Sequence, residues 1–343
     1  MNEGRKEVTI YDIAQALDVS VATVSRALNS DPIVNKKTAK KVVEVAEKMG
    51  YRVNANARSL RKQSTNTLGV IVPRLNSAFI SAAIAGMEAV ANREGYNLII
   101  SQSMEVAEKE IANAQTLLNN RVDGLLVSLS NQTSQLSHFE QYQQRGTPVL
   151  FFDRAPVDSG FPGVVINNRR SAYEAVAHLI EQGCRRILHI TASLNRNVYS
   201  ERLAGYCDAL RAAGMEVQED LVMMGELNMD WGTEAAAAIL AMDTLPDGIF
   251  VTNDNCAVGL ILALRKAGVR IPEDIAVVGF NNDPIGLVVD PNLSTVDYRG
   301  YEMGETAANW LISHLRGTQD LNKTSLIQIK SALIVRQSSL RKV

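Results

Sequence analysis

The sequence is poor in cysteine and has no long apolar segment. Its three cysteines, Cys184, Cys207 and Cys256, lie far apart without a C-x-x-C pair, which argues against a disulfide framework and a cysteine metal site. No apolar run approaches the ~18 residues that a membrane span needs. The polar start MNEGRKEVTI lacks the apolar core of a secretory signal. We therefore expect a cytoplasmic protein without membrane contact.

Signatures of catalysis are missing as well. The sequence has no G-x-G-x-x-G after a strand, no Walker P-loop and no H-E-x-x-H. Its histidines, His138, His178, His189 and His314, are scattered along the chain. These absences predict a protein that is not an enzyme and that needs no cofactor or metal.

The composition that is present indicates two parts of opposite charge. The chain has 343 residues, 46% of them hydrophobic, which suffices for about two domains of ~150 residues. Residues 1–66 carry 12 Lys or Arg against 7 Asp or Glu, a net +5, whereas the remainder carries 23 against 30, a net −7. A basic head is typical of a domain that meets a polyanion, although a solvated Lys-rich helical domain would have the same charge.

The first 50 residues predict three short helices. Thr9 and Asp12 form a T-x-x-D capping box at the first helix, and Ser20 caps the second after a short turn. Thr38 is expected to open the third helix, which Gly50 ends. Apolar residues at helical spacing give each helix an inward face.

The first two predicted helices have the spacing of a helix-turn-helix. A three- to four-residue turn can place the second helix in a DNA major groove. Val21, Ala22 and Arg26 would then reach base edges, and Arg26 could bind guanine in bidentate fashion. An ordinary helical hairpin is the alternative.

From Leu68 onward, apolar strand-like runs alternate with amphipathic helices. The predicted strands are 68–73, 96–100, 124–129, 148–153, 163–166, 186–191, 248–253 and 275–280. The predicted helices between them are 81–95, 112–121, 170–183, 202–214, 232–242 and 257–268. This alternation predicts an α/β fold of parallel sheets covered on both faces. A split near residue 165 suggests two doubly wound lobes, with ligands beyond the carboxyl ends of the strands.

Several segments resemble the lactose-repressor (LacI) family of bacterial transcription regulators. They begin with V-T-I-Y-D-I-A-Q-A-L-D-V-S-V-A-T-V-S-R-A-L-N and continue with Y-R-V-N-A-N-A-R-S-L, R-L-A-G-Y, N-D-N-C-A-V-G, I-P-E-D-I-A-V-V-G-F and P-N-L-S-T-V. They follow the family order and extend over nearly the whole chain. The resemblance therefore adds expectations that periodicity alone cannot give.

The resemblance implies a division into three parts. These are a helix-turn-helix DNA-binding domain at 1–50, a hinge with a short helix at 51–66, and an effector-binding and dimerisation domain at 67–343. The last part resembles a two-lobed periplasmic binding protein. Its first lobe is expected at about 67–165 and 297–325, and its second at about 166–296 and 326–338.

The resemblance also implies two sets of DNA contacts. In the family, paired hinge helices enter the minor groove, and Leu60 matches the apolar wedge between base steps. Val53 replaces a frequent proline, and a plain flexible linker is the alternative for the hinge. The expected head contacts are Thr9, Tyr11, Ser20, Val21, Ala22, Thr23, Ser25, Arg26 and Asn29. The expected hinge contacts are Asn54, Ala57, Arg58, Leu60 and Arg61.

A small-molecule site between the lobes follows from the same resemblance. Asp153 could accept from ligand hydroxyls, Arg202 matches the family's ligand-clamping arginine, and Trp231 suits the apolar face of a pyranose. The other expected contacts are Ala78, Phe79, Arg196, Asn253 and Asn281. Asn281 stands where the family usually has aspartate, which with Arg196 and Arg202 favours an anionic ligand. A sugar acid or sugar phosphate and an uncharged saccharide both remain open.

These expectations together describe a ligand-responsive, sequence-specific DNA-binding transcriptional regulator. Because repression is the commoner behaviour in the family, we expect a repressor of carbohydrate-utilisation genes. We expect it to bind a pseudo-palindromic operator as a homodimer. No heptad tail for tetramers is visible at 331–343. A sugar receptor without DNA function is opposed by the basic head, and an α/β enzyme with a helical appendage by the missing catalytic signatures. Whether ligand releases or promotes DNA binding stays open.

Overall fold

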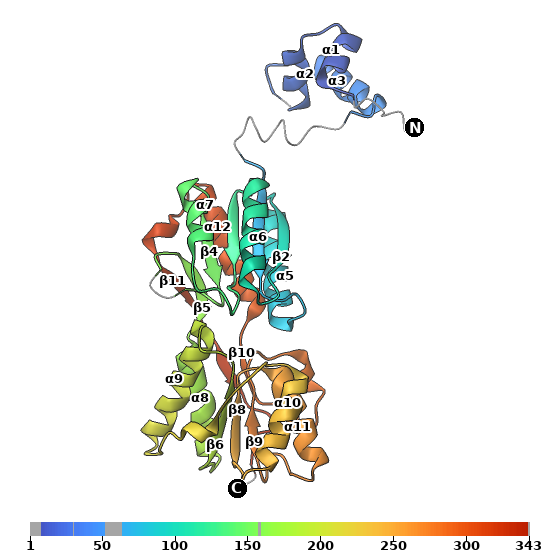
Figure 1. Cartoon of the computed structure of the whole chain (residues 1–343). Helices are drawn as coiled ribbons and strands as arrows, with labels where there is room; N and C mark the ends of the chain where they lie inside the picture. Colours follow the sequence, from blue (N-terminus) through green and yellow to red (C-terminus); the bar gives the residue numbers. More distant parts are fainter. Residues whose placement is uncertain (1–7, 30, 52–63, 157–158, 342–343) are drawn as a thin grey trace. The chain divides into compact units, whose positions relative to one another are not determined.

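The computed structural model describes residues 8–29, 31–51, 64–156 and 159–341. The chain divides between Thr65 and Asn66 into a small helical head and a larger α/β body (Figure 1). A three-helix head followed by a body of two parallel sheets is the predicted fold class, which is confirmed. The predicted hinge helix lies outside the described residues. None of the described helices is long and apolar enough to cross a membrane.

The head contains α1 (Ile10–Leu17), α2 (Val21–Leu28) and α3 (Lys36–Lys48). At the start of α1, the N–H and the hydroxyl of Thr9 both donate to the Asp12 carboxylate at 2.7 Å. At the start of α2, the Ser20 hydroxyl accepts from the N–H of Thr23 at 3.1 Å. Both predicted helix starts therefore form through local side-chain contacts.

The third helix begins two residues earlier than predicted. The Asn35 side chain accepts from the N–H of Lys37 at 2.9 Å and so caps α3 ahead of Thr38. The head core consists of residues from all three helices, namely Ile13, Ala14, Val24, Ala27, Val42 and Ala46. Val43, which follows the buried Val42 on the same helix, is 40% exposed.

The first lobe of the body, the N-lobe, is built on a six-stranded sheet in the order β11-β5-β4-β3-β1-β2, with every neighbouring pair parallel. Its strands are β1 (Thr67–Val72), β2 (Asn97–Gln102), β3 (Gly124–Val127), β4 (Val149–Phe152), β5 (Gly163–Ile166) and β11 (Leu326–Ile329). We placed 326–338 in the second lobe, but β11 pairs with β5 from Leu326↔Gly163 to Ile329↔Ile166. The N-lobe therefore extends to residue 329.

Helices cover both faces of the N-lobe sheet. They are α5 (Ala78–Arg93), α6 (Ala107–Asn119), α7 (Ser137–Gln144) and α12 (Gly300–Leu315). Helices α5 and α12 pack with Leu68, Val70 and Val72 of β1, whereas α6 and α7 pack on the opposite face with Ile71. Neither α7 nor α12 was predicted.

The second lobe, the C-lobe, has a four-stranded parallel sheet in the order β7-β6-β8-β9. Its strands are β6 (Ile187–Thr191), β7 (Val222–Met224), β8 (Gly248–Val251) and β9 (Ala276–Val278). Its helices are α8 (Asn168–Glu181), α9 (Asn197–Ala212), α10 (Met229–Leu240) and α11 (Asp254–Lys266). In Figure 1, α8 and α9 lie on one side of this sheet and α10 and α11 on the other.

The chain passes between the lobes three times. It crosses after β5, through β10 (Thr295–Asp297), and between β11 and β12 (Ala332–Ile334). Strands β10 and β12 pair antiparallel with Thr295 opposite Ile334, which joins the second and third crossings. The lobes are thus connected by a paired ribbon and one further crossing.

The close packing of α5 on α12 predicts a strong effect of two small substitutions. A Cβ on Gly86 would lie 2.2 Å from the carbonyl oxygen of Tyr301, and one on Gly304 would lie 1.9 Å from that of Ala83. Because backbone cannot yield like a flexible side chain, we expect Gly86→Ala and Gly304→Ala each to lower the free energy of unfolding by about 1–3 kcal/mol. Urea unfolding measures this, with the exposed Ala85→Ser as control. Unchanged midpoints would show that the helices are not so closely packed.

Candidate functional site

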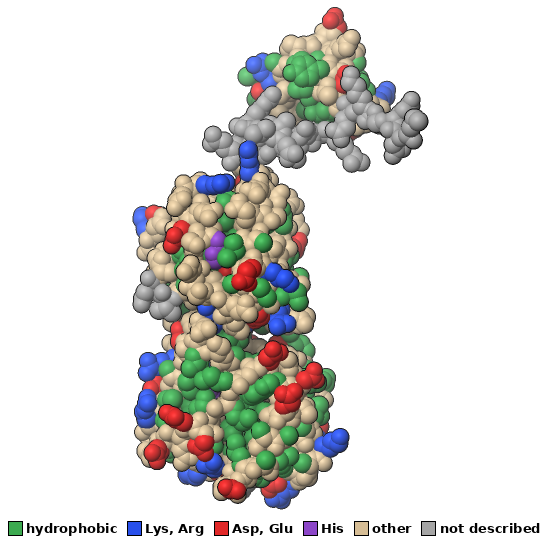
Figure 2. Space-filling model, in the orientation of Figure 1, with side chains coloured by type: hydrophobic (Ala, Val, Ile, Leu, Met, Phe, Trp, Pro, Cys, Tyr) green, Lys and Arg blue, Asp and Glu red, His purple; other side chains and the backbone are tan. Residues whose placement is uncertain are grey.

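A cleft of about 590 Å³ lies between the two lobes. Loops that follow the carboxyl ends of strands in both sheets form much of its walls. They contribute Pro73, Arg74, Asn76, Ser77, Asp153 and Arg154 from the N-lobe and Ala192, Ser193, Thr252 and Asn253 from the C-lobe. The surface is hollowed between the lobes in Figure 2. Parallel sheets commonly bind ligands at this edge.

Arg202 is the central cation of the cleft. It lies on α9 and is 3% exposed. Its Nε donates to the Asn168 side-chain oxygen at 2.9 Å, and its Nη1 donates to the Thr252 carbonyl at 3.1 Å. Its guanidinium lies 3.7 Å from the ring centroid of Phe280. Within the described residues, no carboxylate lies at ion-pair distance from this guanidinium.

Asp153 orders the aromatic wall of the cleft. It follows β4 in the left-handed backbone region (φ +60°) and is 6% exposed. One carboxylate oxygen accepts from the Tyr298 hydroxyl and the other from the Ser128 hydroxyl at 3.1 Å. Tyr298 stacks on Phe79 with centroids 4.3 Å apart. Burial and the charge of Asp153 raise the pKa of Tyr298 well above its usual value, so its hydroxyl remains a donor.

Arg154 joins the two walls on one side of the cleft. Its Nη1 donates to both carboxylate oxygens of Glu105 at 2.9 Å. Its Nη2 donates to the hydroxyl of Tyr199, on α9 in the other lobe, at 3.0 Å. In contrast to Arg202, this arginine is neutralised by a carboxylate of the protein itself.

The C-lobe wall contains four side-chain amides, those of Asn228, Asn253, Asn255 and Asn281. Asn253 caps α11, and its side-chain oxygen accepts from the N–H groups of Asn255 and Cys256. Behind this wall lies the buried Asp254, which accepts from the Thr295 hydroxyl and the N–H of Asp283, each at 2.8 Å. Burial raises the pKa of Asp254 to about 7, with a contribution from the charge of Asp283.

The cleft brings together most of the residues predicted to bind ligand. Its lining includes Phe79, Asp153, Arg202, Asn253 and Asn281. The lining does not include Ala78, Arg196 or Trp231. A Cβ on Gly225 would lie 1.8 Å from the Trp231 ring, so the indole lies against the backbone of Gly225 instead.

Among the cleft residues that the sequence analysis did not predict are Arg154, Tyr199 and Tyr298, which contact the predicted residues or join the two walls. Arg154 directly follows the predicted strand 148–153, so the rule that ligands lie beyond the carboxyl ends of parallel strands could have indicated it. Tyr298 follows β10, a strand that no periodicity indicated. Tyr199 lies in the cleft because the start of α9 contacts the other lobe, which the local sequence does not reveal.

The predicted DNA contacts in the head are mostly accessible. Exposed positions among them are Thr9, Tyr11, Ser20, Ala22, Arg26 and Asn29. Tyr11 is 68% exposed. Thr23 and Ser25 are partly buried, and Val21 packs against the head core, which limits its reach. The turn between α1 and α2 spans three residues and contains Asp18 at φ +51°. The hinge contacts Asn54, Ala57, Arg58, Leu60 and Arg61 lie outside the described residues.

Two family models match the chain. The model described as bacterial regulatory proteins, lacI family, matches residues 9–54. The model described as a periplasmic binding protein-like domain matches residues 176–339. The chain is also 32% identical over 333 residues to catabolite control protein A of Priestia megaterium, covering 97% of this chain and 99% of that protein.

Solved structures agree with these matches. The transcriptional regulator CelR in complex with cellobiose is similar with a TM-score of 0.73 and 26% identity, covering 97% of this chain and 100% of that chain. The lac repressor dimer bound to operator and the anti-inducer ONPF has a TM-score of 0.86 and 23% identity, covering 98% and 100%. The second likeness shows that the fold is shared.

The raised pKa of Asp254 predicts a pH-dependent stability. Between pH about 4 and about 7, the unfolded chain has lost this proton while the folded protein keeps it. The free energy of unfolding therefore falls as pH rises through this range, by at most ~1.4 kcal/mol per pH unit from this group. We expect Asp254→Asn to flatten this slope in urea titrations at several pH values. Burial raises the pKa of Asp283 too, so part of the slope persists.

The exposed Asp290→Asn is the matched control, because its side chain is 87% exposed. It should leave the pH slope as it is in the unchanged protein. An equal slope in Asp254→Asn and in the unchanged protein would mean that Asp254 does not titrate in this range.

Proposed function

Because the chain belongs to the lacI family of bacterial regulatory proteins, we propose that it is a repressor controlled by a small anionic sugar derivative. The head binds operator DNA, and the ligand binds in the cleft between the lobes. The ligand class is inferred from Arg202, a buried cation that faces the cleft and has no carboxylate of the described residues at ion-pair distance.

The head supports the DNA-binding part of the proposal. The helix α2 follows a three-residue turn, and Ala22 and Arg26 are exposed on it. A guanidinium at this place can donate two hydrogen bonds to guanine in the major groove. Exposed lysines at the start of α3, such as Lys37 and Lys40, can contact phosphates and position the helix.

A homodimer is required because one head reads only half of a palindromic site. The C-lobe offers an apolar surface for this contact on α11 and the adjoining turn. Leu262 is 51%, Leu287 56% and Val288 81% exposed. Figure 2 shows hydrophobic side chains gathered over the C-lobe. We propose that Leu262, Leu287 and Val288 pair with the same residues of a second copy.

The lining of the cleft carries as many carboxylates as arginines, so the preference for an acid over a neutral sugar rests on the immediate surroundings of Arg202. Glu105 is already paired with Arg154, and both oxygens of Asp153 accept hydrogen bonds from the protein. The guanidinium of Arg202 has no ion-pair partner among the described residues, and burying an unpaired charge is costly. A carboxylate or phosphate on the ligand would supply it, while Asn253 and Asn281 can bind hydroxyls. CelR, a relative in structure, binds the neutral sugar cellobiose, so the acid would be a specific feature of this chain.

The cleft is proposed to bind its ligand without converting it. Two of the similar solved structures are of proteins described as transcriptional regulators, CcpA of Lactococcus lactis and CelR. The described lining contains no histidine or cysteine that could serve as base or nucleophile. Control then requires that ligand binds the DNA-competent and DNA-incompetent states with different affinity.

Arg26→Ala tests the head. We expect about 5- to 150-fold weaker operator binding, matching the ~1–3 kcal/mol of a bidentate base contact, and relaxed preference at one base position. Fluorescence anisotropy with an operator selected from random DNA measures both. Lys48→Ala, an exposed charge at the far end of α3, is the control and should retain the base preference. Unchanged preference in Arg26→Ala would remove this residue from base recognition.

Arg202→Gln tests the ligand class. Gln keeps a donor for the neighbouring oxygens but removes the charge. Thermal-shift assays use D-gluconate, D-glucuronate, glucose 6-phosphate and glucose as probes. We expect an acid to raise the Tm of the unchanged protein by mass action, and Arg202→Gln to lose this shift. The exposed Arg170→Gln should respond normally. A Tm shift with glucose alone would contradict the anionic ligand class but not the function as a DNA-binding regulator.

A further inference from the structure

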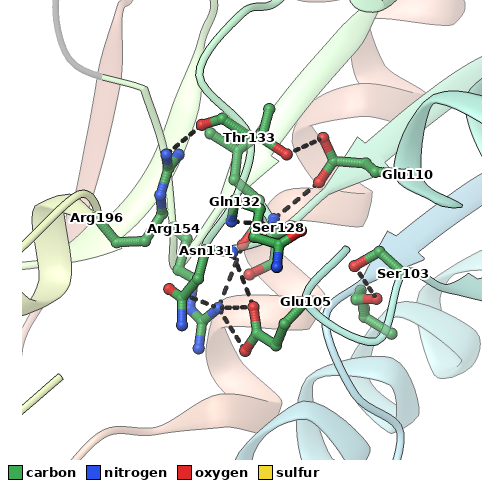
Figure 3. Close-up of polar contacts among 12 residues, drawn as sticks. Ser103, Glu105, Glu110, Ser128, Asn131, Gln132, Thr133, Arg154 and Arg196 are labelled. Atoms are coloured by element: carbon green, nitrogen blue, oxygen red, sulfur yellow. Dashed lines mark hydrogen bonds and ion pairs between the residues drawn. The ribbon is translucent and has the colours of Figure 1, made fainter. Parts of the chain in front are cut away.

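A fully buried carboxylate lies outside the ligand cleft. Glu110, on α6 in the N-lobe, is 0% exposed. It accepts from the N–H of Ser130 at 2.8 Å, from the hydroxyl of Thr133 at 2.8 Å and from Nε2 of His138 at 3.1 Å. Figure 3 shows it directed at the loop 128–133, which follows β3. A buried carboxylate with these partners fixes the conformation of that loop.

The loop held by Glu110 receives a side chain from the other lobe. Arg196 is the residue that precedes α9 in the C-lobe, and its Nη2 donates to the carbonyl of Thr133. In Figure 3, Thr133 lies between Arg196 and Glu110 and contacts both. One residue of the N-lobe therefore links a buried carboxylate of its own lobe to a cation of the other.

Two further hydrogen bonds join the lobes at the same end of α9. The side-chain amide of Asn197 donates to the carbonyl of Asp153 at 3.2 Å. The hydroxyl of Tyr199 accepts from Arg154 at 3.0 Å. Within four consecutive residues, 196–199, the C-lobe thus makes three polar contacts with N-lobe loops.

The environment of Arg196 suits a fixed contact and not a free ligand donor. The side chain is partly buried, and its Nε has no partner within the described residues. Burial and the neighbouring charge of Arg154 lower its pKa. The hydrogen bond from Arg196 to the Thr133 carbonyl therefore offsets part of the hydration that this guanidinium loses on burial.

We propose that residues 196–199 form an interlobe latch, and that Glu110 is the positioning residue that shapes its receiving loop. The latch holds the lobes together on one side of the cleft when no ligand is bound. Arg196 then acts on the ligand response through lobe closure, in contrast to Arg202, which faces the cleft. The role in regulation rests on the proposed function, but the latch can be tested without ligand or operator.

Hydrogen–deuterium exchange of the full-length protein, read by mass spectrometry, tests the latch. The variants are Arg196→Ala and Glu110→Gln, which keeps the size of Glu110 but replaces one acceptor by a donor. Arg211→Ala, a 67% exposed position on the same helix, is the matched control. We expect Arg196→Ala to raise exchange at least about 5-fold in the N-lobe loop 128–133, because one charge-assisted contact is lost.

The decisive result is a change of hydrogen exchange in the C-lobe when Glu110, which contacts only the N-lobe, is replaced. Glu110→Gln should raise exchange at 196–200 in the C-lobe while β1 and β4 of its own sheet stay protected. Faster exchange throughout the N-lobe sheet would instead assign Glu110 a general structural role and overturn the proposal. Unchanged exchange at 196–200, or at 128–133 in Arg196→Ala, would also overturn it. Any of these results leaves the assignment as a DNA-binding regulator untouched.

Discussion

The three crossings between the lobes are the constraint on which the body depends. The second and third crossings pair as β10 and β12, so a ribbon and a single strand connection must bend together in any lobe motion. The parallel strands of both sheets end toward the cleft, which places their polar loops opposite one another. Ligand binding, the contacts of α9 and any relative motion of the lobes therefore share one narrow region.

Within this region, charge compensation distinguishes the arginines. Arg154 is paired with Glu105, and Arg196 reaches a backbone carbonyl of the other lobe. The hydrogen bonds that Arg202 donates go to neutral oxygens, and its guanidinium lies over the ring of Phe280. A ligand with a negative charge would give Arg202 the kind of partner that Arg154 already has in Glu105, whereas Arg196 contacts a backbone carbonyl and does not line the cleft. The same residue type thus serves three different purposes within one helix and its surroundings.

Much of the fold was predictable from the sequence, because buried parallel strands form continuous apolar runs. Strand β11 and helix α12 were missed, since they join the N-lobe only after the chain has built the C-lobe. Site residues at strand ends, such as Asp153 and Asn253, followed from the resemblance and line the cleft. Arg196 and Trp231 do not line it, because their orientation depends on contacts with Thr133 and Gly225 that local pattern cannot encode.

The central claim is that one ligand in the cleft controls DNA binding. The most direct test is whether bound operator changes the affinity for that ligand. Isothermal titration would measure the affinity of the full-length protein for the sugar or sugar acid identified in the thermal screen, with the protein free and then saturated with operator. Thermodynamic reciprocity predicts that operator changes this affinity by about 5- to 150-fold. Equal affinity in the two titrations would contradict the account, because a ligand that binds both states equally cannot shift their balance.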